Sequence, residues 1–153
     1  ASVLAGLARA RFVHFGVHGR FDPRTGWWSG LELADAPETP QPDGLLTPGD
    51  VLLALNVPQQ VVLSACRSAD RGGEQSVTGL SVAEAFLAAG SEQVIATSRD
   101  VLDATAEAVM TALYTQTPPG ELADAASALR DAQRAVMATS PDADWAAYRA
   151  FTL

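Results

Sequence analysis

Two short apolar runs constrain the fold of this chain most strongly. Residues 59–66 (QQVVLSAC) and 92–98 (EQVIATS) carry consecutive aliphatic side chains instead of the alternation of a half-exposed strand. Strands that are apolar on both faces are typical of the middle of a parallel sheet that helices cover on each side. We therefore expect both runs to be central strands of such a sheet.

The residues around these runs alternate between strand and helix patterns. Residues 11–19 (RFVHFGVHG) show a period of two and predict an earlier strand. A short strand is predicted over 30–35, where it forms a hairpin or flap with 20–28. Helices are predicted to begin at Thr47 and to cover 78–90, 103–116 and 121–139, and a final strand is predicted within 142–153. This alternation predicts an α/β sandwich with a mainly parallel central sheet.

Local signals mark several ends of these elements. Thr47 suits a helix N-cap, followed by Pro48 at the first helical position and Asp50 in the first turn. Gly90 is expected to close its helix, and Asp103 to cap the next one. Residues 34–44 (ADAPETPQPDG), rich in proline, predict an exposed loop.

Composition excludes several classes of function. The 153 residues suit one domain, 1–153, and 48% hydrophobic with 18% charged residues is ordinary for a globular protein. A net charge of −8 argues against binding to nucleic acid. No apolar run approaches the roughly 20 residues of a membrane helix, so we expect no membrane span.

The single cysteine limits the chemistry further. Cys66 has no partner for an internal disulfide, and a metal site built on His14, His18 and Cys66 would need carboxylates as well, so we expect neither a metal nor another cofactor. A free thiol favours a reducing compartment, which predicts a cytoplasmic protein. All ten basic residues are arginine, which suggests a GC-rich bacterial genome.

Two strand ends carry reactive side chains. One predicted strand ends at His18-Gly19 and another at Cys66, and functional residues of open α/β sheets lie just beyond such carboxyl ends. If the strands are parallel neighbours, His18 can take the proton of Cys66 and generate the nucleophilic thiolate. The main-chain N–H groups of Gly19 and Cys66 are then natural donors to an oxyanion.

The wider pattern resembles a known family. His18 precedes Cys66 by 48 residues, and SACRS keeps the Ala-Cys-Arg of the caspase signature but has Ser64 and Ser68 in place of its glutamine and glycine. Six motifs follow one another over nearly the whole chain: FVHFGVHGRFD, DGLLTPGDVLLALN, VVLSACRSA, GGEQSVTGLSVAEAFLAAGSEQVIATS, VLDATAEAVMTALY and SALRDAQRAV…DWAAYRAFTL. Together they resemble the CHAT domain, a family of caspase-like cysteine peptidases often found beside TPR repeats.

The resemblance implies a fold, a site and a function. It implies a caspase-like α/β/α sandwich, a His18–Cys66 dyad with Gly19 and Cys66 as oxyanion donors, and cleavage of a specific protein through a thioester. The substrate would be a protein of bacterial defence or regulated cell death, such as a gasdermin, and TPR or other regulatory domains or proteins would be partners. Only ten residues precede Arg11, fewer than is typical of the family, so we expect the major C-terminal part of a longer domain that lacks its first strands.

Two opposite predictions concern the substrate residue on the acyl side of the cleaved bond, called P1. Arg99 follows a serine at a strand end, as does the caspase arginine that holds an acidic P1, although Asp100 could neutralise it. The negative charge of the chain favours instead a basic P1, held by one of four acidic residues: Asp22, Asp70, Glu74 and Asp103.

Other prominent residues have structural interpretations. Trp27, Trp28 and Trp145 are expected to pack, although the tryptophan pair could line a substrate groove. His14 is expected to be packed, and Arg67 either lowers the pKa of Cys66 or lies in a surface ion pair.

Three alternatives to catalysis remain open. Without His18-Gly19 and the family pattern, Cys66 would be interpreted as a buried structural thiol. A peptidase-like domain can also persist as a silent scaffold or interaction module. A flavodoxin-like nucleotide domain is the weakest alternative, because no glycine-rich phosphate loop follows the first strand.

Overall fold

The computed structural model describes residues 3–22, 26–34, 44–70, 79–120 and 122–153. Its helices, 3₁₀ turns and strands run, in chain order, α1 (Val3–Leu7), β1 (Phe12–Gly16), β2 (Gly19–Arg20), η1 (Gly26–Trp28), β3 (Gly30–Glu32), β4 (Leu45–Leu46), α2 (Pro48–Leu52), β5 (Gln60–Ser64), α3 (Val82–Ala88), β6 (Gln93–Thr97), α4 (Asp103–Gln116), α5 (Ala125–Thr139), η2 (Trp145–Ala147) and β7 (Tyr148–Thr152). No helix of the described residues is long and apolar enough to span a membrane.

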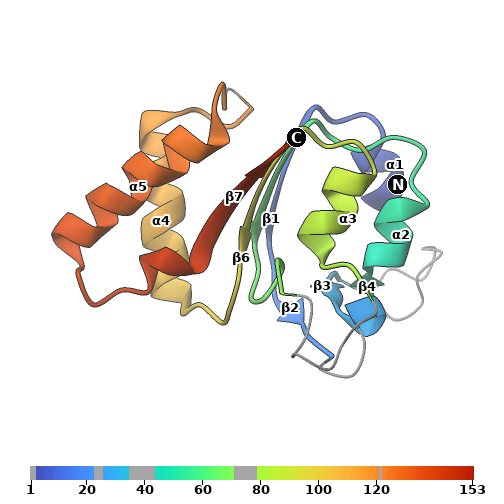
Figure 1. The fold of residues 1–153 in the computed structure, drawn as a ribbon, viewed down its shortest axis with the longest axis horizontal. Coiled ribbons are helices and arrows are strands. Elements are labelled where there is room, and N and C mark those ends of the chain that lie inside the picture. Colours follow the sequence, from blue (N-terminus) through green and yellow to red (C-terminus); the bar gives the residue numbers. More distant parts are fainter. Residues whose placement is uncertain (1–2, 23–25, 35–43, 71–78, 121) are drawn as a thin grey trace.

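A four-stranded sheet of order β1-β5-β6-β7 forms the centre of the molecule. The first three strands are parallel, and β7 runs antiparallel to β6. Helices α1, α2 and α3 lie on one face of this sheet, and α4 and α5 lie on the other (Figure 1). The predicted α/β sandwich with a mainly parallel sheet is confirmed.

The apolar runs fill both sides of the sheet, as their patterns predict. Val61 and Leu63 belong to the core beneath α3, whereas Val62 between them belongs to the core beneath α4 and α5. All three are buried. Because successive side chains of a strand point to opposite faces, a run apolar at every position needs a helix layer on each face.

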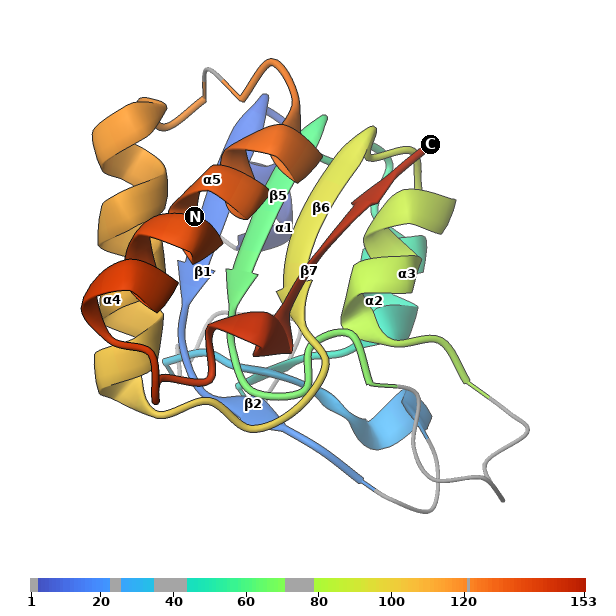
Figure 2. The same ribbon diagram turned by 60° about the vertical axis from the view of Figure 1, so that its left-hand side comes forward.

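A second, smaller sheet of order β2-β3-β4 extends from the end of β1 (Figure 2). The pairing of β2 with β3 is antiparallel and confirms the predicted hairpin. The strand β4 was not predicted, because two residues are too few to show a period. Most of the predicted loop over 34–44 lies outside the described residues.

Helix caps decide where the helices start. Thr47 caps α2 in a capping box with Asp50, as predicted. The helix predicted over 78–90 begins only at Val82, because the Ser81 side chain accepts a hydrogen bond from the Glu84 N–H; Thr78 lies outside the described residues. The helix predicted from residue 121 likewise begins after its cap, Asp124, and Glu121 is outside the described residues.

Two further cap predictions have different outcomes. Gly90 follows the last turn of α3 with a φ of +112°, which confirms it as the residue that closes the helix. The prediction that Asp103 is an N-cap is wrong by one position. Leu102 occupies the cap without a side-chain hydrogen bond, and Asp103 is the first helical residue.

Candidate active site

The register of the central sheet brings the predicted dyad to one edge. In the parallel pair β1–β5, Phe12 faces Gln60 and Gly16 faces Ser64, so facing residues differ by 48 in number. His18 and Cys66 differ by the same 48 and follow the two strands by two residues each. Both therefore emerge beyond the carboxyl ends of neighbouring strands.

Gly19 makes the closest approach to Cys66. A Cβ at Gly19 would overlap the carbonyl oxygen of Cys66, and it would lie 3.0 Å from the Cys66 carbonyl carbon and 3.1 Å from its nitrogen. Only a residue without a side chain fits this contact. The contact holds the His18-Gly19 segment directly against the main chain of Cys66.

The N–H of Gly19 is not used by the small sheet. Glu32 N–H donates to the His18 carbonyl at 2.9 Å, so His18 and Glu32 form a hydrogen-bonded pair of the antiparallel ladder. Such pairs alternate with pairs that exchange no hydrogen bond. The next pair, Gly19 and Leu31, is of the second kind, and the Gly19 N–H consequently points away from β3.

Cys66 lies in a tight turn that hydrogen bonds join to the end of β6 and the residues after it. The Thr97 hydroxyl donates to the Ala65 carbonyl at 2.5 Å, and Arg67 N–H donates to the Arg99 carbonyl at 3.3 Å. Arg67 has a φ of +55°, a left-handed conformation that non-glycine residues rarely adopt and that is common at functional sites. Within the described ranges, the Cys66 N–H donates to no main-chain carbonyl.

The Cys66 thiol contacts the segment that leads into α4. Val101 N–H donates to Cys66 Sγ at 3.4 Å, and the thiol reaches the Val101 carbonyl at 3.5 Å. Cys66 is partly buried and the His18 side chain is exposed. Among the described residues no hydrogen bond joins the His18 imidazole to Sγ, so a thiol that meets His18 has to turn away from Val101.

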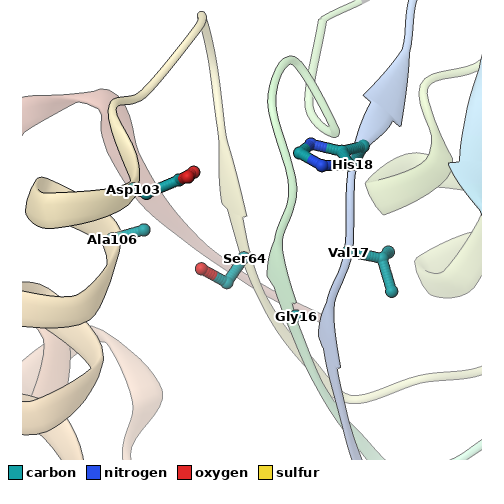
Figure 3. A pocket seen from close by; sticks show the side chains of 6 residues that line it. All are labelled: Gly16, Val17, His18, Ser64, Asp103 and Ala106. Atoms are coloured by element: carbon teal, nitrogen blue, oxygen red, sulfur yellow. The ribbon is translucent and has the colours of Figure 1, made fainter.

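An open pocket of about 320 Å³ lies beside His18. Residues from three parts of the fold line it: Gly16 at the end of β1 with Val17 and His18 just after it, Ser64 at the end of β5, and Asp103 and Ala106 on α4 (Figure 3). The Ser64 hydroxyl shares a hydrogen bond of 2.9 Å with the hydroxyl of Tyr148, and burial raises the pKa of that tyrosine. Tyr148 lies 84 residues from Ser64 in the chain, and no sequence signal links the two.

The arginines near Cys66 are paired with carboxylates. Arg99 donates to both carboxylate oxygens of Asp144, at 2.7 and 2.5 Å, and these hydrogen bonds raise the pKa of Arg99 and lower that of Asp144. The carboxylate that neutralises Arg99 is therefore Asp144 and not its neighbour Asp100. Asp100 accepts from Arg67 Nε at 3.0 Å, and Asp70 lies 3.8 Å from the same guanidinium. The surface ion pair is the interpretation of Arg67 that this geometry favours.

The other candidates that the structure describes are not among the residues that line the pocket. Trp27 and Trp28 form η1 and are 43% and 65% exposed. The N–H of Asp22 donates to the Ser29 hydroxyl at 3.0 Å, next to η1. Glu74 lies outside the described residues.

His14 packs, as expected, on the α4 side of β1. Its ring centroid is 5.4 Å from that of Tyr114, and burial lowers the pKa of His14 and raises the pKa of Tyr114 to about 12. Neither His14 Nε2 nor the Tyr114 hydroxyl has a hydrogen-bond partner among the described residues. In that same part of the chain, no cluster of three histidine, cysteine, aspartate or glutamate side chains is placed to hold a metal ion.

Comparison with known families gives the identity that this geometry suggests. The model of the CHAT domain matches residues 1–152, nearly the whole chain. The chain belongs to the CHAT domain family. This family is related to the caspase-like cysteine peptidases and is often found with TPR repeats, which fits a setting of protein interactions. No curated protein matches the sequence.

Proposed function

We propose that this CHAT domain is a cysteine endopeptidase that acts through His18 and Cys66. The observation that carries the proposal is the packing of Gly19 on the main chain of Cys66, which only the matching strand register allows. The packing supports it because an imidazole, a thiol and two N–H groups, for which the described residues show no main-chain acceptor, share one sheet edge. Those are the groups that acyl transfer requires.

The chemical steps follow from these groups. The Cys66 thiol leaves Val101, His18 accepts its proton, and Sγ attacks the peptide carbonyl carbon. The N–H groups of Gly19 and Cys66 stabilise the oxyanion, each donor being worth about 3 kcal/mol in comparable sites. The C–N bond breaks as His18 returns the proton to the leaving amine. Water, deprotonated by His18, then hydrolyses the thioester.

The competing function is a silent interaction module, and one observation favours it. Cys66 Sγ is bound to the main chain of Val101 and not to His18. Catalytic hydrogen bonds are often long or absent before substrate binds, so this contact does not decide between the two functions. The predicted role in bacterial defence stays a prediction of the family resemblance.

The pH dependence of Cys66 alkylation tests the proposal. Iodoacetamide reacts with the thiolate, so its rate against pH reports how the thiol is deprotonated. We expect rapid reaction below pH 7 in the native chain and loss of that reactivity in His18→Ala. His14→Gln is the matched control, because it changes the only other histidine. A single titration near the ordinary thiol value of about 8.5 in all three chains would favour the interaction module.

A further inference from the structure

The pocket beside His18 has the charge and position of a subsite for the P1 side chain. Cys66 Sγ contacts Val101, and Asp103 follows two residues later, a span of at most about 7 Å along the chain. Asp103 and His18 lie on opposite sides of the pocket, with Ser64 between them (Figure 3). A P1 residue whose carbonyl meets Sγ can therefore direct its side chain towards Asp103.

Asp103 supplies a negative charge to the pocket. Its carboxylate is exposed at the start of α4 and forms no hydrogen bond or ion pair with the described residues. The nearby guanidiniums of Arg67 and Arg99 are both occupied by carboxylates. An acidic P1 side chain would have to displace Asp144 from Arg99, whereas a cationic one meets the Asp103 carboxylate, which is unpaired among the described residues.

The shape of the pocket also suits a long side chain. Gly16, Ser64 and Ala106 leave the space between His18 and Asp103 free of large side chains. The Ser64 hydroxyl, held by Tyr148, adds a second acceptor within the pocket. A carboxylate with a hydroxyl beside it matches the several N–H donors of a guanidinium.

From these observations we infer that Asp103 selects substrates with arginine or lysine at P1. The inference rests on the proposed endopeptidase function and names its substrate class. It decides between the two predictions made from the sequence, in favour of the basic P1.

Three peptide acyloxymethyl ketones that differ only at P1 test the inference. The P1 residues are arginine, norleucine and aspartate, and mass spectrometry follows the labelling of Cys66. We expect the arginine reagent to react fastest. Asp103→Asn should slow it about 10- to 100-fold, the usual effect of losing a charge-assisted hydrogen bond, and leave the norleucine reagent within about twofold. Asp103→Glu should retain part of the preference.

Glu107→Gln is the matched control, because it removes the same charge one turn further along α4, outside the pocket lining. Iodoacetamide is run in parallel on every variant. If its reaction depends on His18 but the P1 series shows no preference for arginine, or a preference that Asp103→Asn leaves unchanged, the subsite inference is overturned and the dyad stands. If Cys66 reacts with every reagent as a free thiol does, both proposals are overturned.

A binding measurement removes the dependence on thiol chemistry. In Cys66→Ala, Nα-acetylarginine amide should shift the NMR amide signals at the start of α4, and Nα-acetylnorleucine amide should not. Equal responses to the two ligands would overturn the inference.

Discussion

Replacing Gly19 with alanine is the sharpest perturbation that the structure offers. The new Cβ would overlap the Cys66 carbonyl oxygen and lie 3.0 and 3.1 Å from two other main-chain atoms of Cys66. Ordinary carbon contacts are about 3.5 Å or more, so the two main chains have to separate by on the order of 1 Å. Neither neighbour is a flexible side chain that could turn away.

This separation has two calculable consequences. Overpacking of this kind costs about 1–3 kcal/mol of folding stability. A shift of this size also moves one N–H out of hydrogen-bond range of the oxyanion. Loss of one such donor lowers acyl transfer about 100- to 1,000-fold.

The assay compares two reactions of Cys66. Acyl transfer from p-nitrophenyl acetate passes through an oxyanion, whereas displacement of iodide from iodoacetamide does not. Gly19→Ala should therefore slow acyl transfer far more than alkylation, while urea unfolding reports the stability loss. Gly49→Ala is the control, because its Cβ would meet only the Thr47 hydroxyl, at 3.6 Å. Native stability and native acyl transfer in Gly19→Ala would refute the reasoning.

Substitutions at three further positions test other parts of the structure. Arg67→Gly should be about 1 kcal/mol more stable than Arg67→Ala in urea unfolding, because only glycine adopts a φ of +55° without strain; equal stabilities would contradict this. Burial lowers the pKa of His14 from 6.5, so the unfolded chain binds a proton at this imidazole more readily than the folded chain does. The contribution of His14 to the free energy of unfolding should therefore be fully present above pH 6.5 and decrease as the pH falls below that value. His14→Phe should flatten this part of the pH profile, and an unchanged slope would show another origin. Thr47→Ala should lower the free energy of unfolding by about 1 kcal/mol in urea, since it removes the cap of α2, whereas Thr47→Ser should lower it little.

The strands and most helices were predictable because their signals are local. The apolar runs that became β5 and β6 are buried on both faces, and the Thr47-Pro48 cap lies where its pattern indicates. Predictions failed at the starts of two helices, where the Ser81 and Asp124 side chains bind N–H groups of the first turn and stop the helix from extending backwards.

The candidate site also combines residues that local patterns predict with residues that only distant contacts bring together. His18, Gly19 and Cys66 could be proposed from the sequence because each lies just beyond a recognisable strand, and His18 and Cys66 are separated by the same 48 positions as the facing residues of that strand pair. Ser64 was noted only as a departure from a signature, and nothing in the sequence showed that Tyr148 would hold its hydroxyl.

Sequence alone determined the layers of this protein and the sheet edge at which its candidate site residues meet, since periodicity and the order of strands along the chain are properties of short segments. Only the tertiary structure decided which charged side chains at that edge are paired. Arg99 and Asp144 are 45 residues apart, yet they form the ion pair that occupies the arginine expected to bind an acidic substrate. Asp103 stays unpaired among the described residues and lines the pocket. Pairing between distant side chains depends on how β6, α4 and η2 pack in three dimensions, and no local pattern encodes that packing.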